Sequence, residues 1–137
     1  MVNVKAWYLG GDDEPLTIKD AADAVSLANR VRAESTGQEV PPLIQFEAHS
    51  ESGWSILQAG FRGDVGVLSY TDRQGASLTQ QPEAVTSADV VTYDYMGHLR
   101  EVPTTAEVAA DLVVTGIESF VTSGGRVPEH SQLAPWD

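Results

Sequence analysis

Apolar and polar residues alternate along several parts of the chain, which is the two-residue period of a β-strand. The alternation predicts strands over residues 2–9, 43–48, 54–61, 65–71 and 89–96. Arg62-Gly63-Asp64 separates two of these runs, so the sequence predicts a hairpin there. The polar stretch 72–88 contains Gly75 and Pro82 and predicts a loop, with a short edge strand near 76–80.

Two other segments repeat their apolar residues at helical spacing. The first repeat, from Ala21 to Val31, predicts a helix over residues 18–34. The second predicts a helix over 109–123, and Gly124-Gly125 supplies the usual exit from a helix. The order of elements, with hairpins in place of regular helical crossovers, predicts an α+β fold. We expect an antiparallel sheet of about five to six strands with the two main helices packed on one face.

Composition limits the classes of function. The chain has 137 residues, which predicts one domain over 1–137. Twenty acidic and eight basic residues give a formal charge of −12, so the chain should repel nucleic acid and attract a basic protein. Acidity for solubility alone is the simpler explanation of the charge. Absent cysteines exclude disulfides and thiolate metal sites, and no export signal or membrane span is visible, which predicts a cytoplasmic protein that does not bind membranes.

No catalytic arrangement is visible in the sequence. His49, His98 and His130 are far apart and lack the spacing of metal ligands, and no glycine cluster has the pattern of a phosphate loop. Neighbouring carboxylates such as Asp12-Asp13 lie in a Gly-Pro loop that water should reach, so they are expected to be surface acids. We therefore predict no enzyme activity, no metal and no cofactor.

An ordered set of residues in the second half resembles a known family. The set comprises Tyr93, Tyr95, Gly97, Glu101, Pro103, the run Ser123-Gly124-Gly125-Arg126-Val127-Pro128, and Trp136. Each piece is common, so only the order and the spacing carry information. Over residues 54–136 the chain resembles bacterial polymorphic-toxin immunity proteins of the first-numbered family (Imm-one), some of which inhibit nucleic-acid deaminase toxins. The resemblance implies an antitoxin that binds a cognate toxin.

Such a toxin would need a basic groove to hold phosphates, and an acidic protein could occupy that groove. We therefore place the toxin contacts on acids and one tryptophan in loops or on an open strand face. The predicted contact residues are Asp12, Asp13, Glu14, Glu47, Glu51, Trp54, Asp64 and Asp72. Two alternatives stay open: a small-molecule-binding module with a concavity lined by the tyrosine strand, and a structural or adaptor domain that self-associates, for example as a homodimer.

Overall fold

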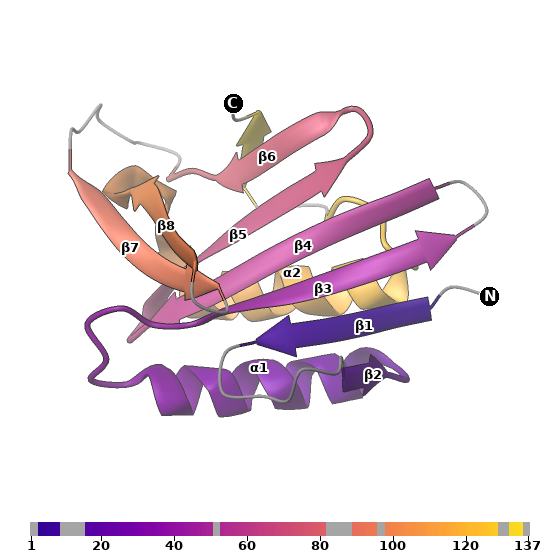
Figure 1. The fold of residues 1–137 in the computed structure, drawn as a ribbon, viewed down its shortest axis with the longest axis horizontal. Helices are drawn as coiled ribbons and strands as arrows, with labels where there is room; N and C mark the ends of the chain where they lie inside the picture. Colours follow the sequence, from indigo (N-terminus) through magenta and orange to yellow (C-terminus); the bar gives the residue numbers. More distant parts are fainter. Residues whose placement is uncertain are drawn as a thin grey trace.

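The computed structural model describes residues 3–8, 16–50, 53–81, 89–95, 98–128 and 132–135. Within these ranges the chain forms ten strands, two α-helices and one short 3-10 helix (Figure 1). The strands are β1 (Asn3–Tyr8), β2 (Leu16–Ile18), β3 (Leu43–Ser50), β4 (Gly53–Arg62), β5 (Val65–Asp72), β6 (Gly75–Thr79), β7 (Val90–Tyr95), β8 (His98–Pro103), β9 (Val108–Ala109) and β10 (Leu133–Pro135). The helices are α1 (Ala21–Ser35), α2 (Ala110–Thr122) and the 3-10 turn η1 (Thr104–Ala106).

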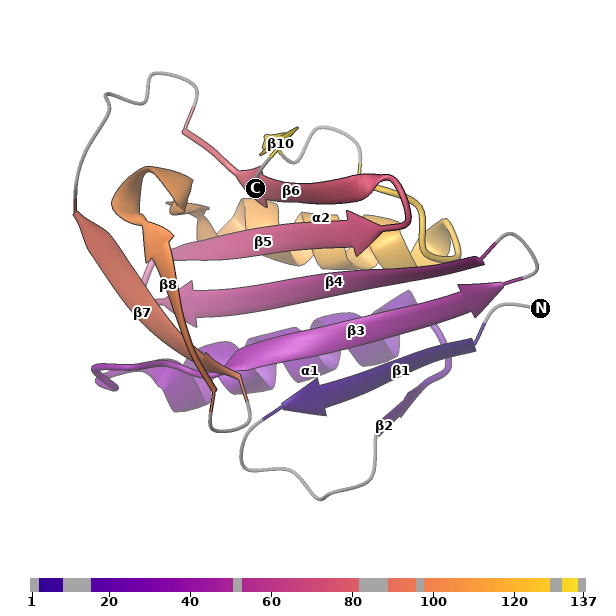
Figure 2. The same cartoon turned by 45° about the horizontal axis from the view of Figure 1, so that its top comes forward.

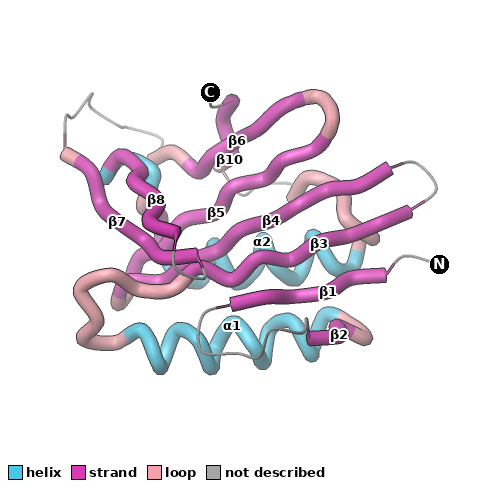
Figure 3. The backbone as a smooth tube through the Cα atoms, viewed as in Figure 1, coloured by secondary structure: helices cyan, strands magenta, loops and turns pink. Residues whose placement is uncertain are grey.

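Eight of the described strands form one sheet in the order β10-β6-β5-β4-β3-β1-β2, with β9 paired to β5 outside this path. The remaining two, β7 and β8, pair with each other in a second sheet (Figure 3). The pairings between these strands are antiparallel. The α+β class is confirmed, but the predicted count of five to six strands is too low. The strands β2, β9 and β10 have two or three residues each, which is too short to show an alternating pattern.

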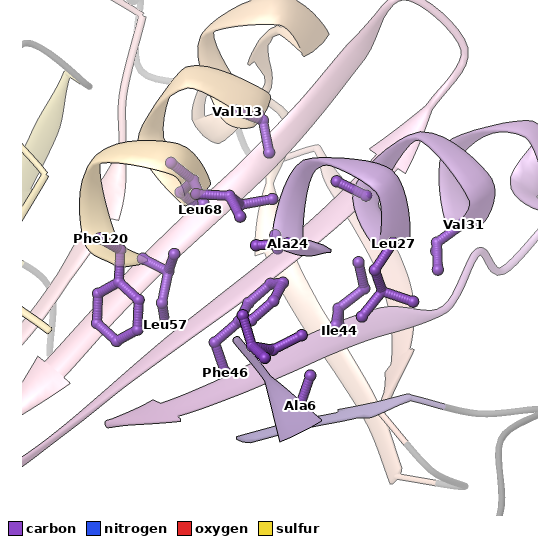
Figure 4. Packing of buried hydrophobic residues seen from close by; sticks show 14 of the residues in the cluster. Ala6, Ala24, Leu27, Val31, Ile44, Phe46, Leu57, Leu68, Val113 and Phe120 are labelled. Carbon is purple, nitrogen blue, oxygen red and sulfur yellow. The ribbon is translucent and has the colours of Figure 1, made fainter. Parts of the chain in front are cut away.

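Both α-helices cover the same face of the large sheet, as predicted (Figure 2). Alternate residues of the central strands point to this face, so Ile44, Phe46 and Leu57 are fully buried there (Figure 4). On α2, Val113, Ile117 and Phe120 meet them at helical spacing. This layer is the main core of the protein.

The opposite face of the sheet is covered at one end by the β7–β8 hairpin, which crosses the strands (Figure 2). The buried side chains between hairpin and sheet include Leu43, Val67, Leu78, Val91, Tyr93, Val102 and Ala106. Gly60 of β4 allows this contact, because a Cβ there would lie 2.7 Å from the ring of Tyr93. No described segment lies over the other end of this face, near the β3–β4 tip (Figure 2).

Most predicted elements are found where the sequence placed them, with two local corrections. Helix α1 begins at Ala21 and not at residue 18, because Leu16–Ile18 pairs with β1. The Asp20 carboxylate caps the helix by accepting a hydrogen bond from the Asp23 amide at 2.9 Å. The sequence predicted no strand between residue 96 and the second helix, but His98–Pro103 forms β8. No helix in the described part of the chain is long and apolar enough to span a bilayer.

Candidate functional site

A cavity of about 390 Å³ lies where the end of α2 meets the open end of the sheet. We call it the helix-exit cavity. Its lining comes from β3, β4, β5, the β5–β6 turn and the exit of α2: Ala48, Gly53, Trp54, Ser55, Tyr70, Asp72, Arg73, Gln74, Ser123, Gly124, Gly125 and Arg126. Most of these residues offer polar groups, whereas drug-sized ligands are usually held in mostly apolar pockets. The lining of this cavity therefore differs from that of a typical pocket for a drug-sized ligand.

The helix exit that forms one wall is fixed by two glycines with left-handed backbone geometry. Gly124 has φ 75° and Gly125 has φ 102°. The Gly125 amide donates to the Phe120 carbonyl at 2.8 Å, and the Gly124 amide donates to the Val121 carbonyl at 3.1 Å. This pair of hydrogen bonds is the Schellman pattern, which needs a residue that tolerates positive φ. The sequence predicted this exit correctly.

Hydroxyl groups of the sheet hold the helix exit in place. The Ser55 Oγ donates to the Gly125 carbonyl at 2.6 Å, and the Tyr70 hydroxyl donates to the same oxygen at 3.2 Å. A Cβ on Gly125 would lie 2.6 Å from the Cβ of Ala48, so the backbone approaches β3 too closely for any side chain. Burial first, and then the charge of Asp72, raises the pKa of Tyr70, so this hydroxyl stays protonated and able to donate.

Two arginines and one tryptophan are among the residues that line the cavity. Arg73 lies in the β5–β6 turn, which the Asp72 carboxylate tightens by accepting a hydrogen bond from the Gln74 amide at 2.8 Å. The Arg126 amide donates to the Ser123 hydroxyl at 3.1 Å. Neither arginine forms an ion pair with a carboxylate in the described ranges. Trp54 is 38% exposed, which is high for a large aromatic side chain.

A row of polar side chains lies on the sheet face opposite the helices, and it runs from the buried Gln58 towards the uncovered end. Gln58 donates to Gln45 at 2.8 Å, and Gln45 donates to the Glu47 carboxylate at 3.0 Å. His49 Nε2 lies 3.8 Å from the other oxygen of Glu47. Tyr95 reaches towards this row from β7, and its pKa is raised by burial and then by the charge of Glu47. The row is an ordered polar surface next to Trp54, the cross-strand partner of His49.

The structure brings together only some of the predicted contact residues. Trp54 and Asp72 line the helix-exit cavity, and Glu47 lies on the adjacent sheet face. Asp64 lies in the β4–β5 turn at the other end of β4, where Arg32 approaches it at 3.8 Å. The remaining four, Asp12, Asp13, Glu14 and Glu51, lie outside the described residues.

In a second polar cluster, at the covered end of the sheet, the side chains form hydrogen bonds with one another. Glu107 is buried and accepts two hydrogen bonds from Arg62, at 2.8 and 3.0 Å. The Tyr93 hydroxyl donates to the same carboxylate at 3.2 Å. Burial, followed by the charge of Glu107, strongly raises the pKa of Tyr93. Because Arg62 and Glu107 are 45 residues apart, no local sequence pattern indicates this cluster.

Within the described residues, no group of three or more histidine, aspartate or glutamate side chains is placed to hold a metal ion. No curated protein has a matching sequence. The sequence does match a family described as Immunity protein Imm1, over residues 12–135. This match spans most of the 137 residues, including every strand and helix from β2 to β10. The chain belongs to the Imm1 family of immunity proteins.

Proposed function

We propose that this protein binds the toxin domain of a polymorphic toxin system and neutralises it by covering its active site. Membership of an immunity-protein family supports a toxin as the partner. The resemblance to inhibitors of deaminase toxins and the charge of −12 support a toxin that acts on nucleic acid, because such an enzyme needs a basic groove. The protein then acts in the cytoplasm by binding alone, as one domain, without a cofactor and without turning over a substrate.

The observation that carries this proposal is the position of Trp54. Energetic hot spots in protein interfaces are enriched in tryptophan, tyrosine and arginine, and Trp54 is a partly exposed tryptophan beside polar side chains. Trp54 lies between the helix-exit cavity and the uncovered sheet face that carries Glu47. We therefore centre the toxin contact on Trp54, Glu47 and Asp72. Asp12, Asp13, Glu14, Glu51 and Asp64 are proposed as outer contacts.

The small-molecule alternative receives less support. It would need a sizeable concavity beside the tyrosine strand, and the cavity that Tyr93 lines measures only about 20 Å³. That volume holds about one water molecule. Self-association is measured directly in the binding experiment, because a homodimer would change the mass of the protein without toxin.

The experiment combines protection and binding. A candidate toxin domain, sought in the neighbouring gene, is expressed in bacteria with and without the immunity protein, and growth is measured. An inactivated toxin is then titrated with the wild-type protein and with Trp54→Ala. We expect protection by the wild type, and binding at least about 30-fold weaker for the variant, as hot-spot truncation costs about 2 kcal/mol or more.

Leu99→Ala is the matched control, because Leu99 is a large exposed apolar side chain on β8 at the covered end. Its affinity for the toxin should stay within about twofold of the wild type. If the wild type neither binds the toxin nor protects the cell, the proposed function is wrong. If Trp54→Ala and Leu99→Ala bind equally well, the contact surface is wrong and the function stands.

The outer acidic contacts have a separate test. Lysine in place of Asp12, Asp13 and Glu14 should slow association with a basic toxin, and the wild-type association rate should fall as salt is added. Stopped-flow fluorescence at several ionic strengths measures both effects. A rate that does not depend on salt would exclude electrostatic capture.

A further inference from the structure

Two of the three charged residues that line the helix-exit cavity are arginines, in a strongly acidic protein; the third is Asp72. Three of the eight basic residues have carboxylate partners in the described part of the chain. These are Arg30 with Glu34, Arg32 with Asp111 and Asp64, and Arg62 with Glu107. Arg73 and Arg126 have no such partner, although they come from distant parts of the sequence and line the same cavity. Two guanidinium groups at one cavity, without a carboxylate partner among the described residues, offer a site for an anion.

The fold itself explains only one of these two arginines. Arg126 follows the C-terminus of α2, where a cation balances the partial negative charge of the helix end. Arg73 has no comparable role, because the turn that contains it is held by the hydrogen bond from Gln74 to Asp72. The Asp72 carboxylate is itself occupied by this donor and lies beside the Tyr70 hydroxyl. Among the described residues Arg73 has no carboxylate partner, so its guanidinium is available to a group outside them.

We propose that the helix-exit cavity receives an acidic side chain of the toxin, whose carboxylate is held by the guanidinium groups of Arg73 and Arg126. This inference rests on the proposed function and names the chemistry of one contact within it. Arginine presents paired N–H donors in a plane, which match the two oxygens of a carboxylate. The residues that flank the acidic side chain in the toxin pack on the exposed indole of Trp54.

A protein carboxylate fits this site better than a nucleic-acid phosphate. The net charge of −12 repels a polyanion at long range, whereas a basic toxin is attracted as a whole and can still present one acidic side chain locally. The cavity is also closed on its inner side by Ser55, Tyr70 and Gly125, whose polar groups are already bonded to one another. It therefore accommodates a short side chain at its rim and not a continuous strand.

Charge reversal tests the proposal because two effects predict opposite signs. Arg73→Glu and Arg126→Glu make the protein more acidic, so long-range attraction to a basic toxin would increase. Loss of the carboxylate contact would instead weaken binding. We expect at least about tenfold weaker binding of the inactivated toxin for each variant, measured by calorimetry. Arg30→Glu on α1 is the matched control, with the same charge change at an exposed site, and its affinity should be unchanged or higher.

A second measurement identifies the partner group. Each aspartate and glutamate of the toxin domain is replaced by alanine and titrated against the wild type and Arg126→Ala. One toxin acid should show non-additive losses, with a coupling of about tenfold or more. Thermal melting of every variant checks the fold, and Arg73→Gln and Arg126→Gln provide neutral replacements if a glutamate variant fails to fold.

The outcomes separate this inference from the proposed function. If the cavity variants bind and protect like the wild type, the carboxylate site is wrong and the proposed function stands. If the wild type binds no toxin, both are wrong. A short single-stranded oligonucleotide at physiological salt is the last arm: binding by the wild type that Arg73→Glu abolishes would make the cavity a phosphate site and overturn the proposal.

Discussion

The charged groups at the two ends of the large sheet differ in whether they have partners within the protein. At the covered end, Arg62 is bonded to the buried carboxylate of Glu107, and Tyr93 of the β7–β8 hairpin donates to the same group. At the open end, Arg73 and Arg126 line a cavity without a described carboxylate partner. Strand β4 runs from one end to the other. It therefore connects the hydrogen-bonded cluster at Glu107 to the cavity where two arginines lack a described carboxylate partner.

This difference indicates which polar groups support the fold and which are available for a partner. A satisfied network in a low-dielectric site stabilises the structure, and leaving one member unpaired is costly. Solvent-exposed charged side chains at the edge of a cavity contribute little to stability. They can therefore serve binding without a large cost to the fold. We therefore expect substitutions at the covered end to act mainly on stability and substitutions at the open rim to act mainly on toxin affinity.

Gly125 is the point where the open end depends most on packing, so Gly125→Ala should have the largest effect on stability. The new Cβ would meet Ala48 at 2.6 Å, and φ of 102° is strained for alanine. Strain and overpacking together should lower the free energy of unfolding by about 3 kcal/mol. Urea denaturation measures this loss.

Gly37→Ala is the control for Gly125→Ala. Gly37 also has positive φ, at 83°, but a Cβ there meets no atom within 4 Å. Its substitution should cost only the backbone strain, about 1 kcal/mol. If both variants lose the same free energy of unfolding, the close packing of the helix exit on the sheet does not contribute to stability.

At the covered end, Glu107→Ala should be the most damaging change. It removes the acceptor for Arg62 and for Tyr93, and it leaves the buried Tyr93 hydroxyl without this partner. We expect a loss of about 2 kcal/mol, less than for a fully buried pair because water can still reach the half-exposed Arg62. Glu101→Ala on β8 removes an exposed carboxylate and should change stability by less than about 0.5 kcal/mol. If both variants unfold at the same urea concentration, the cluster at Glu107 does not hold the hairpin.

Alkaline pH should act at both ends, because Tyr93 lies at the covered end and Tyr70 lines the helix-exit cavity at the open end. The pKa of Tyr93 is raised above its ordinary value by burial and by Glu107, and those of Tyr70 and Tyr95 are raised mainly by burial. Above pH of about 10 the unfolded chain releases tyrosine protons that the folded chain retains, so stability falls as pH rises. Each such tyrosine contributes a slope of up to about 1.4 kcal/mol per pH unit.

Tyr93→Phe removes one of these contributions. The variant should lose about 1 kcal/mol near pH 8, where the missing hydrogen bond to Glu107 dominates. Between pH 10 and 11 its stability should fall less steeply than that of the wild type. Urea denaturation at these pH values gives both slopes, and identical slopes would show that Tyr93 titrates normally in the folded protein.

Sequence patterns were sufficient to predict the elements that depend only on residues close together in the chain. The hairpin of β4 and β5 follows from two alternating runs around a glycine turn, and the exit of α2 follows from Gly124-Gly125. The strand β8 was missed because Pro103 and the charged residues before it read as a connection. Strands of two or three residues form because a longer neighbouring strand has backbone N–H and C=O groups that need partners. They are too short to show a repeating pattern in the sequence.

The candidate site was only partly predictable for the same reason. Trp54 and Asp72 were identified from exposure and charge, and the structure places both at one cavity. Arg73 and Arg126 were not, because net charge is the sum of the charges and does not show their arrangement. The hydroxyl groups of Ser55 and Tyr70 that hold the helix exit lie 70 and 55 residues from Gly125 in sequence. Only the folded chain brings these groups together.

The most direct comparison of the two ends replaces the same residue type at each. Arg62→Ala removes two hydrogen bonds to the buried Glu107 and should cost about 1 to 2 kcal/mol. Arg73→Ala removes an exposed side chain from the β5–β6 turn and should change the free energy of unfolding by less than about 0.5 kcal/mol. Toxin affinity should show the reverse order, with the larger loss for Arg73→Ala. Urea denaturation and calorimetry on the two variants measure both quantities, and a loss of stability at Arg73 equal to that at Arg62 would make the open-end arginine part of the fold.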